Sequence, residues 1–308
     1  MENINNKEKN FVSAVVYLRN NETGIVNFVR GLNETLSSFF AKYEIIIVND
    51  CSSDKSVERV KEYAKENEGS AISILNMSFA QGVEQCMNAG LDLAIGDFVF
   101  QFDYSHNDWD WDLLMDVYRQ SLKGFDIVCA VNTKRTKSQP LFYYLFNKYA
   151  QIHHKVCDNS FCIITRRGIN RVRSLTKQVP YRNALYANCG LGMYNLEYKY
   201  ESEVVKLEVP RHSYNSLILF TDLGYKAARN MTFLMAGVIL FVIIYALVFF
   251  FIGHPVEGWT TTMLLLGVSF FGVFAIMAVI LKYLSLLTSL VFHKQNYVFE
   301  SIEKLVNQ

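Results

Sequence analysis

The sequence has no excess of charge of either sign. It contains 30 Lys and Arg residues against 29 Asp and Glu residues, so the formal net charge is +1. Proteins that bind nucleic acid normally carry a clustered basic surface, so this balance argues against a nucleic-acid partner. The chain also has no internal repeat and no low-complexity segment, which excludes a repeat architecture.

Zinc-like cysteine spacing and an export signal are also absent. The six cysteines include no C-x-x-C pair. Residues 1–10 are polar and no signal-type apolar region follows them, so we expect the first 230 residues to face the cytoplasm. In that reducing compartment we predict that the cysteines are free thiols and form no site.

Charge is missing altogether from two long apolar runs. Residues 231–252 and 260–281 are each 22 residues without a charged side chain, about 33 Å as a helix against a hydrocarbon core of roughly 30 Å. We therefore predict a transmembrane hairpin rather than a buried helical pair in a soluble core. By the positive-inside rule, the flanking cations place both termini in the cytoplasm of a multi-pass inner-membrane protein. These cations are Lys226, Arg229, Lys282 and Lys294.

Residues 11–130 alternate between strand-like and helix-like periodicity. Short β-branched and aromatic runs alternate with amphipathic segments, and this series predicts an α/β fold with a mostly parallel sheet covered on both faces. Ligands of such sheets bind beyond the carboxyl ends of the strands. The first four predicted strands are 11–18, 43–50, 71–77 and 97–102, and the helices between them are 24–40, 52–68 and 82–96.

The apolar runs divide the chain into parts. We predict a cytoplasmic α/β domain over 1–212, an amphipathic juxtamembrane helix over 213–230, the hairpin over 231–281 and a cytoplasmic interfacial segment over 282–308. Aromatic residues between 142 and 152 follow helical spacing with little charge, which fits a helix at the membrane surface or one in the core. Small residues in the hairpin, Gly267 and Gly272, can support a homo-oligomer.

Polar residues follow the first two predicted strands. Asp50 ends the second strand, and serines and a helix start come after it. A carboxylate at this edge can accept hydrogen bonds from a base or ribose while the helix N-terminus faces an anion, an arrangement that suits a nucleotide. Asn21 and Glu22 occupy the neighbouring crevice. An ordinary turn or cap role for Asp50 is the alternative.

Asp103 and Ser105 follow the fourth predicted strand. Residues i and i+2 of an extended segment point the same way, so their oxygens can bind Mg²⁺ or Mn²⁺ together with a diphosphate. Ser105 is a weak neutral ligand, so such an ion would depend more on phosphate and water. Asp108, Asp110 and Asp112 can add metal ligands, but they alternate with tryptophans and fit equally well the first turn of the next helix, where acids favour the dipole.

Three further residues are candidates for the acceptor side. Asp158 follows a helix and precedes an apolar strand, so it can serve as a general base, although an Asp-Asn turn explains it equally simply. Arg166 comes after that strand. Arg211 precedes the juxtamembrane segment and can neutralise a lipid phosphate or be an ordinary juxtamembrane cation.

The order of these features resembles the family 2 glycosyltransferases with the GT-A fold, in particular the polyisoprenyl-phosphate glycosyltransferases. That group includes dolichyl-phosphate mannose synthase and the bactoprenol glucosyltransferases. Asn21 and Glu22 are similar to the end of the family's P-x-Y-N-E opening. The segment "VNDCSSDKS" resembles its V-D-D-G-S-x-D-x-S/T segment, with Asp50 and Ser52 matched and Cys51 in place of glycine.

Further motifs along the chain extend the resemblance. The stretch "QGVEQCMNAGLDLAIGDFVFQFDYS" looks like the family's F-G-x-x-x-A-x-x-A-G-L-x-x-A-x-G-D followed by its D-x-D strand, with Gly82 and Asp103 matched and Ser105 replacing the second aspartate. Cys162 stands where arginine is usual, and Asp158 is offset from the expected catalytic acid. The segment 283–302 resembles the family's segment after the hairpin.

The resemblance implies a membrane-bound, inverting and metal-dependent transfer of a hexose from a UDP- or GDP-linked donor to a polyprenyl phosphate, for cell-surface glycan synthesis. Two alternatives stay open. One keeps the fold with a glycan or lipid-headgroup acceptor, and the other is a degenerate, non-catalytic nucleotide-binding module. The resemblance implies that Asp103 and Asp158 are catalytic and that Asp103 and Ser105 hold Mg²⁺ or Mn²⁺. Arg166 and Arg211 would contact the acceptor phosphate. The residues expected to bind the nucleotide sugar are Asn21, Glu22, Asp50, Ser52 and Gly82.

Overall fold

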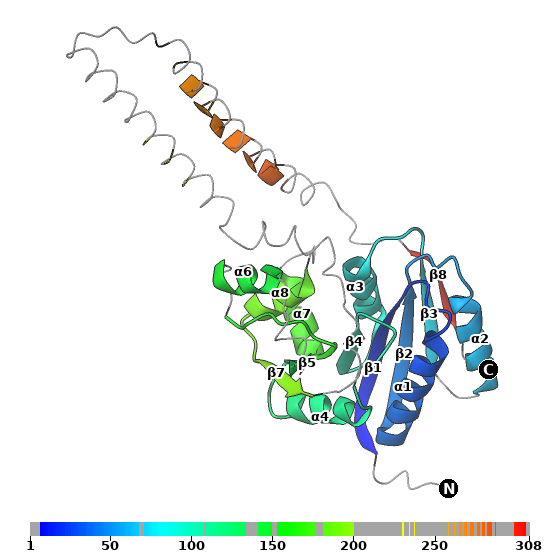
Figure 1. The fold of residues 1–308 in the computed structure, drawn as a ribbon. Coiled ribbons are helices and arrows are strands. Elements are labelled where there is room, and N and C mark those ends of the chain that lie inside the picture. The colour runs from blue at the N-terminus through cyan, green and yellow to red at the C-terminus, as the bar shows by residue number, and fades with distance from the viewer. Residues whose placement is uncertain are drawn as a thin grey trace.

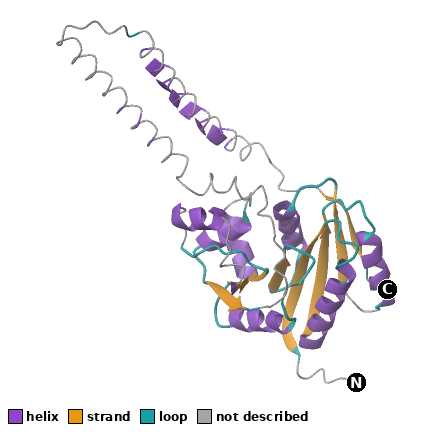
Figure 2. Ribbon diagram, viewed as in Figure 1, coloured by secondary structure: helices purple, strands orange, loops and turns teal. Residues whose placement is uncertain are grey.

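The computed structural model describes residues 7–67, 71–107, 109–133, 141–149, 153–175, 181–199 and 299–305, with isolated positions between 230 and 287. These residues form one eight-stranded sheet with helices on both faces (Figures 1 and 2). The strands are β1 (Glu8–Leu18), β2 (Phe40–Asn49), β3 (Ile72–Met77), β4 (Phe98–Phe102), β5 (Ile127–Asn132), β6 (Phe161–Thr165), β7 (Met193–Tyr198) and β8 (Phe299–Lys304). The helices are α1 (Ile25–Phe39), α2 (Ser56–Glu66), α3 (Val83–Leu93), α4 (Asp112–Ser121), α6 (Leu141–Tyr149), α7 (Arg166–Leu175) and α8 (Arg182–Asn188).

The sheet is mixed, with the strand order β7-β5-β6-β4-β1-β2-β3-β8. The strands β4, β1, β2 and β3 are parallel neighbours, as the alternating periodicity predicts, and β5 and β7 also pair in parallel. β6 lies antiparallel between β4 and β5, and β8 lies antiparallel beside β3. The predicted α/β fold is therefore confirmed. The sheet is mostly parallel, as predicted, but it is mixed because β6 and β8 run against the other six strands.

Alternate side chains of the central strands belong to two separate cores. Val12, Ala14 and Val16 of β1 pack on the side of α1, α2 and α4. Val15 lies on the opposite side, in the core that α3, α6, α7 and α8 share. Successive side chains of a strand point to opposite faces, so an uninterrupted apolar strand is buried on both sides.

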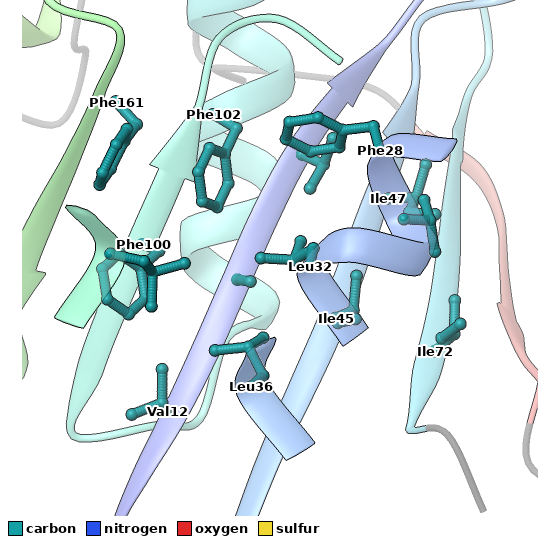
Figure 3. Close-up of a cluster of buried hydrophobic side chains, with 14 of the residues drawn as sticks. Val12, Phe28, Leu32, Leu36, Ile45, Ile47, Ile72, Phe100, Phe102 and Phe161 are labelled. Atoms are coloured by element: carbon teal, nitrogen blue, oxygen red, sulfur yellow. The ribbon is translucent and has the colours of Figure 1, made fainter. Parts of the chain in front are cut away.

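Helix α1 shows how its sequence pattern determines its packing. Phe28, Leu32 and Leu36 recur at helical spacing and are all buried against the sheet. Figure 3 shows them facing Ile45 and Phe102, and the rings of Phe28 and Phe102 meet edge to face with centroids 5.5 Å apart. The apolar stripe in the sequence is therefore the face that covers the sheet.

Helix α6 corresponds to the aromatic segment that fitted either a membrane surface or the core. Tyr143 and Phe146 are buried in the core on the α3 side of the sheet. Tyr144 is 59% exposed. The structure therefore packs one face of this helix into the protein and leaves Tyr144 accessible.

The register brings the carboxyl ends of four parallel strands to one edge. Leu18 of β1 pairs with Asn49 of β2, and Asn49 pairs with Asn76 of β3. On the other side of β1, Val16 pairs with Phe102 of β4. The segments after these strands therefore meet at a common edge of the sheet, where ligands of such sheets bind.

The predicted membrane segments fall mostly outside the described residues. Only isolated positions of 213–230, 231–252 and 260–281 are described. No helix in the part of the chain that the structure describes is both long enough and apolar enough to span a membrane. Residues 299–304, which belong to the predicted cytoplasmic interfacial segment 282–308, form β8 at the edge of the sheet (Figure 1).

The cysteines are not all free thiols as predicted. Cys129 of β5 and Cys162 of β6 lie opposite each other on neighbouring strands, with Cα atoms 4.1 Å apart, and form a disulfide. They are 33 positions apart in sequence, so only the pairing of β5 with β6 reveals their proximity. Cys51, Cys86, Cys157 and Cys189 lie outside this disulfide.

The contact of α3 with the sheet predicts the effect of a substitution at Gly90. A Cβ atom there would lie 2.3 Å from Val15 Cγ1 and 2.9 Å from Val48 Cγ2, and β-branched side chains have little rotameric freedom to withdraw. We expect Gly90→Ala to lower the free energy of unfolding by about 1–3 kcal/mol, as overpacking does. Denaturant unfolding measures it.

Gly192→Ala is the matched control. Apart from the residues adjacent in the chain, its new Cβ would lie no closer than 3.5 Å to any atom, the nearest being Phe125 Cδ1, which is an ordinary van der Waals distance. We expect this control to change the free energy of unfolding by less than about 0.5 kcal/mol. Equal stabilities of the two variants would contradict the close packing of α3 on β1 and β2.

Candidate active site

Asp50 follows β2 and is fully buried. Its Oδ1 accepts a hydrogen bond from the Gln81 backbone N–H at 2.6 Å, and its Oδ2 accepts one from the Gly82 N–H at 3.1 Å. Tyr17 Oη and Arg19 Nη1 also donate to Oδ2, at 2.9 and 3.3 Å. Burial, followed by the negative charge of Asp50, raises the pKa of Tyr17, so this phenol remains a donor. Asp50 therefore joins the segments after β1, β2 and β3.

Gly82 is fixed by the same contact. It precedes α3 with φ +88°, a backbone conformation that side chains other than glycine rarely adopt. Its N–H points to Asp50, so the segment after β3 lies against the segment after β2. Both residues were expected at the nucleotide, and the structure brings them into direct contact.

Residues 49–53 are the end of β2 and the segment that follows it, which we call the Asp50 turn. Cys51 has φ +56°, in the left-handed region, and it stands where the resemblance expects glycine. The Ser52 N–H donates to Asn49 Oδ1 at 3.0 Å, and the Asn20 N–H donates to Ser52 Oγ at 3.1 Å. Side-chain hydrogen bonds thus hold a turn that its own sequence does not favour.

Asn21 connects the segment after β1 with Ser105. Its Nδ2 donates to Ser105 Oγ at 2.8 Å and to the Ser105 carbonyl at 2.9 Å. Glu22 lies beside it and accepts from the Lys55 N–H at 3.2 Å. Asn21 was expected at the nucleotide and Ser105 at the metal, and in the structure the two are hydrogen-bond partners.

Asp103 is held by Arg182, a residue that no sequence motif marks. Arg182, the first residue of α8, donates from Nη2 to Asp103 Oδ1 at 2.6 Å. Its Nε donates to Glu84 Oε2 at 2.9 Å, and its Nη1 donates to Gln101 Oε1 at 2.6 Å. The Arg182 side chain is 3% exposed, whereas that of Asp103 is 25% exposed.

Arg182, Glu84, Gln101 and Asp103 form what we call the Arg182 cluster, and the pKa values of its charged members depend on one another. Although burial acts to lower it, the carboxylates of Asp103 and Glu84 raise the pKa of Arg182 above its usual value. Burial raises the pKa of Glu84 against the opposing effect of the arginine. Tyr186 Oη, which donates to Gln101, also has a pKa raised by burial, to about 12. A buried guanidinium between two carboxylates is stable only while its partners remain in place.

Asp158 precedes β6 and is half-buried beside α8. After burial, its negative charge is among the causes that raise the pKa values of Tyr143 and Tyr181. The amide of Asn183 in α8 donates to Asn159 Oδ1 at 3.4 Å. The segment that carries Asp158 therefore contacts the helix that holds Asp103.

Arg166 lies away from these residues. Because β6 is antiparallel to β4, Thr165 pairs with Phe98 at the beginning of β4. Arg166 there donates to the carbonyls of Ala94 and Gly96 at 2.8 and 2.6 Å. Arg166 was expected at the acceptor phosphate. The structure instead places it at the edge of the sheet where β4 begins, opposite the edge that carries Asp50 and Asp103. Arg211, the other expected acceptor residue, lies outside the described residues.

In the described residues of the expected metal site, one carboxylate oxygen remains available to a divalent ion. Within the described parts of the chain, no three or more His, Cys, Asp and Glu side chains gather as a metal site. Ser105 is 6% exposed and bonded to Asn21, while Arg182 takes Oδ1 of Asp103. This leaves Oδ2 of Asp103. Mg²⁺ commonly binds through one or two carboxylates together with substrate phosphates and water, so the donor set fits an ion carried with a diphosphate.

Comparison with known proteins places this site in a family. Residues 13–175, more than half of the chain, match the family described as glycosyl transferase family 2. The chain belongs to this family. The expected resemblance is therefore confirmed, and the Asp50 turn, Gly82 and Asp103 all lie within the matched part.

Relatives share low identity with the chain. It is 23% identical over 265 residues to the glycosyltransferase YkcC of Bacillus subtilis, covering 81% of this chain and 80% of that one. It is 26% identical over 127 residues to an undecaprenyl-phosphate 4-deoxy-4-formamido-L-arabinose transferase of Pseudomonas aeruginosa, covering 41% and 37%. A mannosyltransferase from Pyrobaculum calidifontis, solved with GDP-Man and Mn²⁺, has a similar fold, with a TM-score of 0.50, 14% identity, and coverage of 94% and 77%.

Removal of the Arg182 charge should destabilise the fold, because a buried carboxylate would lose its cation. We expect Arg182→Met to lower the free energy of unfolding by about 3–5 kcal/mol, because Glu84 would be left buried without its cation. Denaturant unfolding of the full chain measures the change.

Arg119→Met is the matched control. Arg119 pairs with Asp116 at 3.4 Å on the surface, and both side chains are more than half exposed. We expect a change below about 1 kcal/mol, as for other exposed pairs. If the two substitutions cost the same, the Arg182 cluster does not hold Asp103 as described.

Proposed function

We propose that this protein transfers a hexose, with inversion, from a nucleoside-diphosphate sugar to a polyprenyl phosphate at the cytoplasmic face of a membrane. Membership of glycosyl transferase family 2 gives the reaction class. The observation that carries the proposal is the convergence of the Asp50 turn, Asn21 and Asp103 at one edge of the sheet. An anchored carboxylate beside a polar turn is suited to a donor with a nucleoside and a diphosphate.

The donor would bind along the edge formed by the segments after β1 to β4. Asp50 is occupied by protein donors, so its role would be to fix the turn and Gly82. Asn21, Glu22 and Ser52 would line the nucleotide side. Holding the donor in one orientation is the main contribution such a site can make before any bond changes.

Asp103 would meet the diphosphate end of the donor. Its Oδ2 would hold Mg²⁺ or Mn²⁺ together with the phosphates, and the bound ion would offset the charge of the departing nucleoside diphosphate. Arg182 would act through Asp103 by keeping its carboxylate in a single orientation. Preorganised charge of this kind usually provides the largest part of catalysis.

The acceptor would approach from the side of Asp158. The segment that carries this carboxylate contacts α8, the same helix that holds Asp103 through Arg182. Asp158 can therefore orient the acceptor or take its proton. A phosphate is already a good nucleophile, so positioning matters more than activation. The name of the Pseudomonas aeruginosa relative, an undecaprenyl-phosphate transferase, supports this choice of acceptor.

We also propose that the apolar runs 231–252 and 260–281 anchor the protein in the cytoplasmic membrane, with both termini inside. Their length matches the hydrocarbon core. Arg211, before the first run, would lie near lipid phosphates, and the glycines of the second run would permit a homo-oligomer. A membrane location would bring the catalytic edge to a lipid acceptor.

A donor screen tests the proposal. Full-length protein in detergent is incubated with UDP- and GDP-hexoses, undecaprenyl phosphate and Mn²⁺, and the extracted lipid is analysed by mass spectrometry. We expect one donor to give a lipid heavier by one hexose. Asp103→Asn should lower the rate at least about 100-fold because it removes the charge facing the diphosphate.

Asp112→Asn is the control for that substitution. Asp112 is an exposed acid at the start of α4, so its replacement should leave the rate within about twofold of the unchanged protein. Sugar transferred to a glycan or lipid headgroup instead would reject the polyprenyl acceptor. No product with any donor and acceptor would favour the non-catalytic alternative.

A further inference from the structure

The C-terminal strand β8 makes polar side-chain contacts with the end of β3. Asn76 of β3 pairs with Ser301 of β8 in the antiparallel register. The Asn76 Nδ2 donates to Ser301 Oγ and to Glu303 Oε1, each at 3.0 Å. Glu303 also forms an ion pair with Lys61 of α2 at 2.5 Å. The orientation of the Asn76 amide is therefore determined by β8.

The same amide meets the Asp50 turn through Asn49. Asn49 Nδ2 donates to Asn76 Oδ1 at 3.0 Å, and Asn49 Oδ1 accepts from the Ser52 N–H at 3.0 Å. Ser52 Oγ then accepts from the Asn20 N–H at 3.1 Å. A continuous series of side-chain hydrogen bonds thus runs from β8 through two asparagines to the segments after β2 and β1.

Each asparagine amide in this series is fixed at both ends. The Asn76 Oδ1 is an acceptor while its Nδ2 is a donor, so rotation of the amide would break the contacts on both sides. Asn49 is only 8% exposed, so water cannot readily replace a lost partner. Cys51 occupies the left-handed region, and the turn around it needs these bonds to hold its shape.

We propose that β8 positions the nucleotide-binding turn, with Asn76 as the positioning residue that transmits its contact. The inference rests on the proposed function, because it assumes that the Asp50 turn meets the nucleotide. Asn76 and Asn49 act through the turn. The strand that supports the turn thus follows the predicted hairpin in sequence, and Ser301 comes 249 positions after Ser52.

Nucleotide binding tests this arrangement in the full chain. Isothermal titration with UDP and with GDP, each in the presence of Mn²⁺, is carried out on the unchanged protein and on the Ser301→Ala/Glu303→Ala double variant. We expect the Kd of the nucleotide that binds to rise about fivefold to tenfold, the effect of losing a modest hydrogen-bond contribution. In turnover assays the KM of the donor should rise similarly, with kcat within about twofold.

Glu300→Ala is the matched control. It removes a carboxylate from the same strand, but Glu300 is exposed and makes none of the contacts described for Asn76. Its Kd should stay within about twofold of the unchanged protein. A merely structural role of β8 would lower the unfolding temperature and kcat while leaving the Kd unchanged.

A double-mutant cycle tests the path itself. In an Asn76→Ala background, the further replacement of Ser301 and Glu303 should change the Kd by less than about twofold, because the connection is already broken. A Kd of the double variant equal to that of the unchanged protein, or full additivity in the cycle, would overturn the inference alone. Failure of the unchanged protein to bind either nucleotide would overturn the proposed function as well.

Discussion

The ion pair between Arg182 and Asp103 determines which part of the candidate site can meet a ligand. The guanidinium is almost fully buried and takes one carboxylate oxygen of Asp103, so the other is the oxygen left for a ligand or an ion. The same guanidinium neutralises Glu84 at the start of α3. Burying these charges is costly, and only their mutual contacts make it possible. The position of Asp103 therefore depends on α3, β4 and α8 together.

Asp50 is anchored in a different way and to a similar effect. Its carboxylate is satisfied by two backbone N–H groups, a phenol and an arginine, so it joins three segments rather than facing outwards. The Asp50 turn and Asp103 are consequently held by separate buried networks, and Asn21 connects them through Ser105. Such anchoring restricts the motion of groups that would bind the donor, which lowers the entropy lost on binding.

Sequence periodicity was sufficient to predict the parallel part of the sheet and the edge at which the site lies. Local apolar patterns specify β1 to β4 and their helices, and parallel strands carry their following segments to one edge. The direction of β6 could not be obtained this way, because a short apolar run is compatible with both parallel and antiparallel pairing. That direction moved Arg166 to the opposite edge and brought Cys162 beside Cys129.

Arg182 shows a similar limit for the candidate site. It lies in a short helix without an evident motif, and its significance comes from contacts with residues 79 and 98 positions away in sequence. The sequence does contain one signal, since Asp103 is a carboxylate that directly follows the mostly apolar strand β4. Such a charge needs a buried partner, but nothing in local spacing says which of the chain's arginines provides it.

The sequence by itself determined the family, the α/β fold and the loops in which the polar site residues lie, because these follow from local periodicity and from short motifs. Tertiary structure decided how the side chains of those loops are used. Asp50 became a buried anchor, one carboxylate oxygen of Asp103 was taken by Arg182, and β8 came to support the Asp50 turn. Each of these outcomes depends on hydrogen bonds between segments distant in sequence, and local patterns carry no information about such partners.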